Sequence, residues 1–278
     1  MSAEPSQSSA TSLDAVLARD LEQKSLEVPL LPQVASEVLS SSLDDRANAQ
    51  RLAELIERDQ SLASHILRVV NSPAFRGSAE IVALKQAIAR LGMERIREIA
   101  LTISLRGSIF KPGRFASLVE DAWKRGLRTG LWSKEIARAA RHNVEIAYLC
   151  GLLHNVGVPI MVNRICELDD EVDAATLTDL VGRYAPQAGA ILVSEWRLPG
   201  VVADCINRLG LSDSADSDPN SRILSAGRHM CDLQTSDALL VENVVPQPAF
   251  QALNFYPDDI ETLLGLAEQI QLTVESMA

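Results

Sequence analysis

The sequence predicts an all-α protein, and three observations support that prediction. Apolar residues recur at helical spacing in most segments, as do Leu52, Leu55 and Ile56. No stretch shows the sustained alternation of apolar and polar residues, or the Asn-Gly hairpin turn, that strands would bring. Aromatic residues make up only 4% of the chain, so its 47% hydrophobic fraction consists mostly of Leu, Ile, Val and Ala, a mix that favours helices.

Caps, breakers and periodicity place the individual helices. Residues 1–10 are rich in Ser, Ala and Gln and are expected to fray, and a short helix then runs over 13–25. Pro32 suits the first turn of the next helix, Asp59 can cap another, and Pro73 stops it because proline disfavours helical geometry at the preceding residue. Further helices are predicted over 48–59, 82–91 and 94–109 (separated by Gly92), 116–140, 144–155 (with a turn at 157–159 and a continuation to 164), 176–184, 187–196, 199–209, 219–234 and 258–276.

A turn marks the junction between two helical subdomains. The sequence KPGR at 111–114 combines proline and glycine between two helical stretches. We assign 1–12 to a flexible N-terminus, 13–112 to an N-terminal helical subdomain and 113–278 to a second helical subdomain. The polar, acidic segment 211–220 is predicted to be a loop within the second.

Several classes of protein are excluded by composition. No uninterrupted apolar run approaches the ~18 residues that span a bilayer, the longest being Ala147–Leu153. The first fifteen residues lack the basic and apolar regions of a secretory signal. We therefore expect a cytoplasmic protein with no membrane span and with reduced, buried thiols. The thiols are those of Cys150, Cys166, Cys205 and Cys231, which include no CxxC pair.

The charge is unevenly distributed along the chain. The net charge is −11, yet residues 85–141 contain thirteen Lys or Arg and five Asp or Glu, a local excess of +8. Such a basic segment is suited to an anionic ligand or an acidic partner. The alternative is that these arginines lie on solvated helix faces and pair with acidic neighbours. The whole-chain charge and the lack of a helix-turn-helix pattern both argue against binding to nucleic acid.

The element Asn71-Ser72-Pro73 interrupts two helical stretches. Asn71 can end its helix and tolerate a left-handed conformation, and the Ser72 hydroxyl can bond nearby backbone. We favour a structural role for this element over ligand binding.

Taken together, six segments resemble the HDOD family, the HD-related output domain of bacterial signalling proteins. They are VPLLPQVASEVLS, LAELIERDQSLASHILRVVNSPAF, VALKQAIARLGMERIREIAL, DAWKRGLRTG, AYLCGLLHNVGVPIMV and AGAILVSEWRLPGVVADCI, which occur in order within roughly residues 25–210. The resemblance implies an all-helical HDOD-like fold: an N-terminal helical subdomain, and a second subdomain similar to the HD metal-dependent phosphohydrolases.

An HD hydrolase holds its metal with a distant His, an adjacent His-Asp pair and a further Asp, and this chain departs from that pattern. The first histidine position falls on Arg125, whose guanidinium has no lone pair for a metal. The pair falls on His154-Asn155, so the bridging carboxylate is a neutral amide. His65, His142 and His229 form no H-x-x-x-H pair and do not replace the missing ligands. We therefore predict no metal site, no catalytic residues and no cofactor.

The sequence favours a non-catalytic regulatory protein of signal transduction that binds a protein partner or a small ligand. Arg125, Arg128, His154 and Asn155 would then form a vestigial pocket for an anion, since arginine suits phosphate. His154 can instead bond backbone carbonyls and brace the turn that follows it.

Two other functions remain open. The chain could be a divergent metal-dependent phosphohydrolase that acts on a nucleotide with ligands from outside the family pattern. It could also be a sensor that binds a nucleotide second messenger without hydrolysing it. The sequence does not indicate the oligomeric state.

Overall fold

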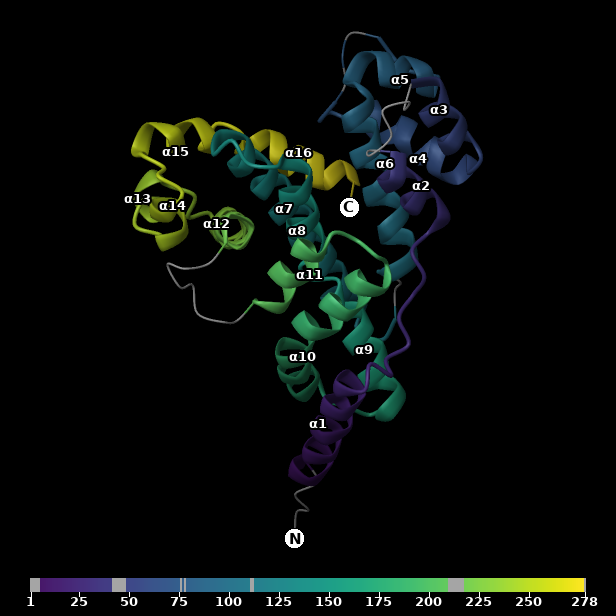
Figure 1. The fold of residues 1–278 in the computed structure, drawn as a ribbon, viewed down its shortest axis with the longest axis vertical. Helices are drawn as coiled ribbons and strands as arrows, with labels where there is room; N and C mark the ends of the chain where they lie inside the picture. The colour runs from purple at the N-terminus through teal and green to yellow at the C-terminus, as the bar shows by residue number, and fades with distance from the viewer. Residues whose placement is uncertain are drawn as a thin grey trace. The chain divides into compact units, whose positions relative to one another are not determined.

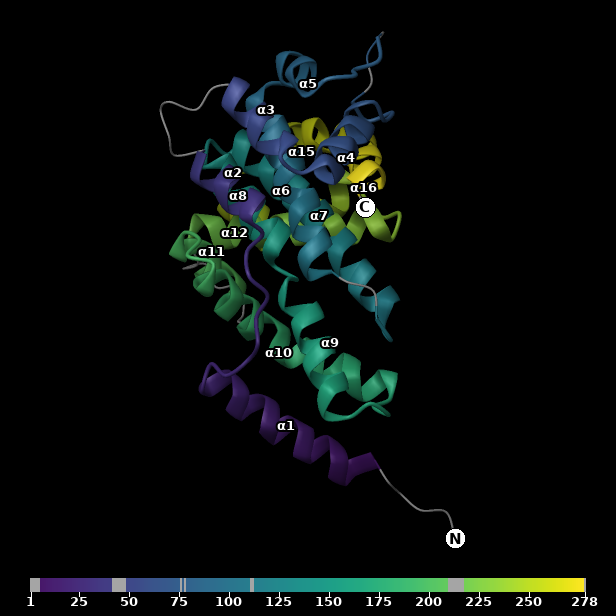
Figure 2. The same cartoon turned by 90° about the vertical axis from the view of Figure 1, so that its right-hand side faces the viewer.

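The computed structural model describes residues 6–41, 49–75, 77, 79–110, 113–209 and 218–277. Within these ranges every regular element is a helix, so the predicted all-α class is confirmed (Figure 1 and Figure 2). The chain divides into two compact units, one made of Met1–Pro29 with Pro112–Leu264 and the other of Leu30–Lys111 with Gly265–Ala278.

The larger unit contains ten of the described helices. They are α1 (Ser6–Glu22), α7 (Ala116–Ala139), α8 (Val144–Leu153), α9 (Gly157–Leu168), α10 (Ala174–Glu195), α11 (Gly200–Asn207), α12 (Pro219–Thr235), α13 (Val241–Val244), α14 (Pro248–Ala252) and α15 (Pro257–Leu264). The long helix α7 packs against both α8 and α12, while α10 packs on α9 and α11. The core of this unit therefore lies around α7 and α8, which run side by side in Figure 1.

Glycine makes the α7–α8 contact unusually close. A Cβ atom on Gly151 of α8 would lie 2.5 Å from the Cα of Gly130 on α7, so position 151 has no room for a side chain, and a Cβ on Gly130 would lie a tight 3.0 Å from the amide nitrogen of Leu152. The two helix backbones meet there, and the fully buried Trp123 and Trp132 fill the space along the rest of α7. Trp132 donates its indole N–H to Oε1 of Gln234 on α12 at 2.9 Å, which joins the third helix to this core.

The first helix belongs to the larger unit and begins earlier than predicted. Leu13, Leu17 and Leu21 form its buried stripe, and α1 packs on α10, as Figure 2 shows. Because this contact holds the helix, the chain is helical from Ser6 onward, where we expected flexibility through residue 12. Asp20 accepts two hydrogen bonds from Arg164 of α9, at 2.9 and 2.7 Å, and so fixes α1 from its other side.

The smaller unit contains α2 (Gln33–Ser41), α3 (Ala49–Glu57), α4 (Gln60–Val70), α5 (Leu84–Leu91), α6 (Met93–Ile109) and α16 (Ala267–Met277). Its central helix is α6, which contacts each of the other five. Along the chain, this division into units changes between Lys111 and Pro112. Two segments fall in a different unit from the subdomain we assigned them to. Residues 13–29 belong to the larger unit, because α1 packs on α10, and residues 265–278 belong to the smaller unit, because α16 packs on α6.

Two predicted helix boundaries are wrong. The segments 176–184 and 187–196 form one helix, α10, with Pro186 inside it. The predicted helix 258–276 is two helices, because α15 ends at Leu264 and α16 starts at Ala267.

One stretch of the described chain has the length and apolar character of a membrane-spanning helix. It is Val144–Leu168, which covers α8 and α9. Its most apolar window is 72% buried within the structure, as in the core helix of a globular domain. The four cysteines are free; Cys166 is only partly buried, whereas Cys150, Cys205 and Cys231 are buried as expected.

Candidate functional site

The candidate site lies in the larger unit, where α7, the end of α8 and α12 pack together. Helix α8 ends at Leu153, and His154 caps it with its backbone still in helical geometry. The turn that follows leads into α9 at Gly157, so the histidine is held between two helices of the core. Arg125 and Arg128 lie on α7, and α12 contributes Arg228.

His154 is buried and electrically neutral. Its side chain is part of a residue only 4% exposed, and its Nδ1 lies 2.7 Å from the carbonyl oxygen of Gly151. Burial, together with the charges of Arg228 and Arg125, lowers the pKa of His154 to about 3, although the bond to Gly151 acts in the opposite direction. Because a carbonyl oxygen only accepts, Nδ1 carries the proton, and Nε2 is left as an acceptor. Nε2 has no hydrogen-bond partner within the described chain.

Arg125 connects α7 to α12 through an ion pair. Its Nη2 lies 2.6 Å from Oδ1 of Asp232, and the two side chains are 43% and 47% exposed. The backbone carbonyl of Arg125 also accepts a long contact, 3.9 Å, from the thiol of Cys231. The guanidinium thus already holds one oxyanion, a carboxylate of its own chain.

The other two predicted residues make contacts of their own. Arg128 donates to Oγ1 of Thr235 on α12 at 3.4 Å, and Asn155 donates to the carbonyl of Ala122 on α7 at 3.4 Å. Of the four residues, Arg125 lies near enough to His154 for its charge to lower the histidine's pKa. Arg128 bonds one turn farther along α12, and Asn155 braces α7 against the turn.

Sequence reasoning missed the contribution of α12. Among the charges that lower the pKa of His154, that of Arg228 has the largest effect. Asp232 forms the ion pair with Arg125. Their only signal in the sequence is that they lie four residues apart, on one face of a helix. Nothing in that spacing points to α7, which lies about a hundred residues earlier.

We tested whether these residues fit the divalent metal of an HD hydrolase. A site of that kind needs several nitrogen and carboxylate ligands. His154 offers a single nitrogen, Arg125 offers no lone pair, and the amide of Asn155 donates to Ala122. Two guanidinium charges act on the histidine, and no group of three His, Cys, Asp or Glu that could hold a metal occurs among the described residues. The residues do not fit the metal.

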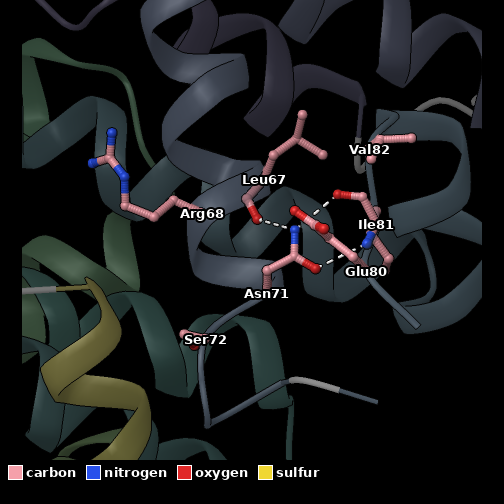
Figure 3. Close-up of a pocket in the computed structure, with 7 residues that line it drawn as sticks. All are labelled: Leu67, Arg68, Asn71, Ser72, Glu80, Ile81 and Val82. Atoms are coloured by element: carbon pink, nitrogen blue, oxygen red, sulfur yellow. Dashed lines mark hydrogen bonds between the residues drawn. The ribbon is translucent and has the colours of Figure 1, made fainter. Parts of the chain in front are cut away.

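A second feature, in the smaller unit, is an open pocket of about 640 Å³ beside the Asn71-Ser72-Pro73 element (Figure 3). Asn71 ends α4 and clamps two segments together. Its amide donates to the carbonyls of Leu67 and Ile81 at 2.9 and 2.8 Å, and its Oδ1 accepts the backbone N–H of Ile81 at 2.9 Å. The lining residues are Leu67, Arg68, Asn71, Ser72, Glu80, Ile81 and Val82.

The Asn71 clamp agrees with a structural role for this element. Asn71 ends the helix with a φ of −93°, so it does not use the left-handed conformation that asparagine can tolerate. The Ser72 hydroxyl is buried and has no hydrogen-bond partner in the described part of the chain, contrary to the local bond we expected. Arg90 holds the following loop by donating to the carbonyls of Phe75 and Ala79. Figure 3 shows Arg68 extending away from the clamp.

The fold and the site define an all-helical module with a buried histidine within range of two arginine charges. Comparison with protein families agrees: the model of the HDOD domain matches residues 28–209. The chain belongs to the HDOD domain family.

Solved structures share the fold. An HDOD domain protein of unknown function from Geobacter sulfurreducens matches with a TM-score of 0.72 and 18% identity, over 96% of this chain and 99% of that one. A protein from Shewanella amazonensis SB2B, provisionally named a metal-dependent phosphohydrolase, matches with a TM-score of 0.73 and 18% identity, over 98% and 100%. A provisionally named signal transduction protein from Marinobacter aquaeolei VT8 has a TM-score of 0.67 and 20% identity, over 96% and 66%. These identities support a shared fold alone.

Among sequence relatives, an uncharacterized protein of Treponema pallidum (strain Nichols) is 25% identical over 208 residues, which is 68% of this chain and 39% of that protein. A 70-residue stretch is 36% identical to the uncharacterized protein YuxH of Bacillus subtilis (strain 168), covering 25% of this chain and 17% of that protein. The chain thus spans less than half the length of either relative.

Proposed function

We propose that this protein is a non-catalytic regulatory protein of bacterial signal transduction that works in the cytoplasm by binding. The observation that carries the proposal is the charge around His154. Burial and the guanidinium charges of Arg228 and Arg125 keep the imidazole neutral. The same two charges oppose a divalent cation and favour an oxyanion.

The ligand we propose for this site is an anionic group, supplied by a small molecule or by an acidic partner. Arginine presents a planar fork of donors that matches carboxylate and phosphate. The 2.6 Å ion pair between Arg125 and Asp232 supports this, because it places a carboxylate in the position that a ligand's oxyanion would take. A nucleotide second messenger would be one such ligand.

The name of the Marinobacter relative, a provisional signal transduction protein, agrees with a regulatory function. The name of the Shewanella relative favours the second candidate, a metal-dependent phosphohydrolase. That candidate requires metal ligands other than those of the HD pattern, since only His154 remains of them.

Binding of inorganic phosphate tests the proposed site. Isothermal titration calorimetry would compare the parent with Arg125→Gln and with a matched control, Arg138→Gln. Arg138 lies on the same helix, is half-exposed and pairs with Glu135 one turn away. We expect phosphate to bind the parent and the control alike and to lose affinity for Arg125→Gln. Phosphate that fails to bind the parent, or that binds Arg125→Gln as well as the control, contradicts the anion site.

Elemental analysis separates the two candidates. Protein purified without chelator should contain far less than one equivalent of any transition metal. About one or two bound equivalents would instead support the hydrolase and send the work to nucleotide hydrolysis assays.

A further inference from the structure

The site has a feature that positive charge does not explain. Nε2 of His154 is a hydrogen-bond acceptor, it is buried, and it has no partner in the described chain. Buried polar groups are nearly always bonded, and an acceptor left alone destabilises the folded protein. An isolated acceptor at this depth therefore indicates a missing donor.

The histidine cannot easily become a donor at Nε2. Its proton is fixed on Nδ1 by the 2.7 Å bond to the Gly151 carbonyl, and moving that proton to Nε2 would leave two acceptors facing each other. A second proton is opposed by burial and by the charges of Arg228 and Arg125. A fully deprotonated oxyanion would thus place an oxygen lone pair against the lone pair of Nε2.

We propose, building on the anion site of the preceding section, that the ligand is an oxyanion that carries its own hydrogen-bond donor, of the hydrogen phosphate type. Its charged oxygens bind the guanidinium of Arg125, in place of the Asp232 carboxylate, and its O–H donates to Nε2 of His154. The exchange starts at the half-exposed ion pair, which is the accessible edge of the site. His154 is the residue that determines specificity, and the arginines supply the affinity.

Two simple ions separate these roles. In mildly alkaline solution, phosphate and sulfate are both tetrahedral dianions of similar size, but hydrogen phosphate keeps one O–H and sulfate has none. The arginines cannot distinguish them by charge, whereas Nε2 of His154 can. Methyl phosphate gives a third case, because its dianion contains phosphorus but no O–H.

The experiment is isothermal titration calorimetry of the full chain with sodium phosphate, sodium sulfate and methyl phosphate, at about pH 8 and matched ionic strength. We expect phosphate to bind at least roughly 10-fold more tightly than the other two, which is the effect of one lost bond to a buried acceptor. His154→Phe, which has no acceptor, should bind phosphate and sulfate equally. Arg125→Gln should weaken both and leave their ratio unchanged.

The outcomes distinguish the requirement for a hydrogen-bond donor from the anion site on which it rests. If none of the three ions binds, the anion site itself is wrong. If phosphate and sulfate bind the parent equally, and both lose affinity in Arg125→Gln, the anion site stands and the donor requirement is refuted. Methyl phosphate that binds as tightly as phosphate refutes the requirement independently, so the test does not depend on His154→Phe folding.

Discussion

Replacing Gly157 with alanine should strongly destabilise the larger unit. Gly157 is the first residue of α9, directly after the turn that begins at His154. A Cβ atom there would lie 1.9 Å from the carbonyl oxygen of Ala185 and 2.7 Å from the amide nitrogen of Gly189, both on α10. These are backbone atoms, so no change of rotamer relieves the overlap. The helices would have to move apart by about 1.5 Å to restore an ordinary contact distance, which opens the packing along their length.

The cost of this movement should be at the upper end of the range for overpacking, about 3 kcal/mol or more. Urea denaturation followed by circular dichroism would measure it as a lower midpoint with an unchanged slope. Gly182→Ala is the matched control, because it lies inside α10 with no atom within 4 Å of the added Cβ. That variant should gain about 0.5–1 kcal/mol through helix propensity. A Gly157→Ala protein within about 0.5 kcal/mol of the parent would refute the reasoning.

Three further changes test the contacts around the two sites. Between pH 6.5 and the folded-state pKa of about 3, His154 binds a proton in the unfolded chain but not in the folded protein. The free energy of unfolding should therefore fall by about 1.4 kcal/mol per pH unit because of this residue. His154→Phe should therefore lose stability less steeply than the parent between about pH 6 and 5, and parallel curves would count against a neutral buried imidazole. Asp232→Asn should tighten phosphate binding several-fold in calorimetry by releasing Arg125, and unchanged affinity would mean that the ion pair does not compete. Asn71→Ala removes three hydrogen bonds and should lower the free energy of unfolding by about 2–3 kcal/mol in urea denaturation. Asn71→Asp keeps only the Oδ1 acceptor and should lose most of the same stability.

Local signals in the sequence predicted much of the fold correctly. Asp59 caps α4 by accepting the N–H of Leu62 at 3.0 Å, and Gly92 separates α5 from α6 with a φ of +83° that glycine adopts readily. Each of these depends on residues within a few positions of one another. Pro186 is the contrary case: read locally it ends a helix, but packing on α9 and α11 keeps α10 continuous.

The candidate site was only half predictable for a related reason. The family pattern places Arg125 and His154, because both belong to segments with recognisable neighbours. Arg228 and Asp232 lie beyond residue 209, where the family match ends, and they reach α7 only through the packing of α12. The spacing of residues along one helix cannot indicate which distant helix that face will meet.

The charge at residue 125 determines whether the site favours a cation or an anion. In the HD pattern, a neutral imidazole at residue 154 would share a cation with a second histidine and a carboxylate. The family resemblance implies that Arg125 takes the place of the histidine and Asn155 that of the carboxylate, which would replace two metal ligands with a cation and a neutral amide. In this chain the Nδ1 of His154 donates to a backbone carbonyl, and its Nε2 presents a lone pair. Without a metal ion, a hydrogen donor is what satisfies that lone pair. A site that keeps this acceptor beside an arginine is therefore proposed to select an anion with a proton to share.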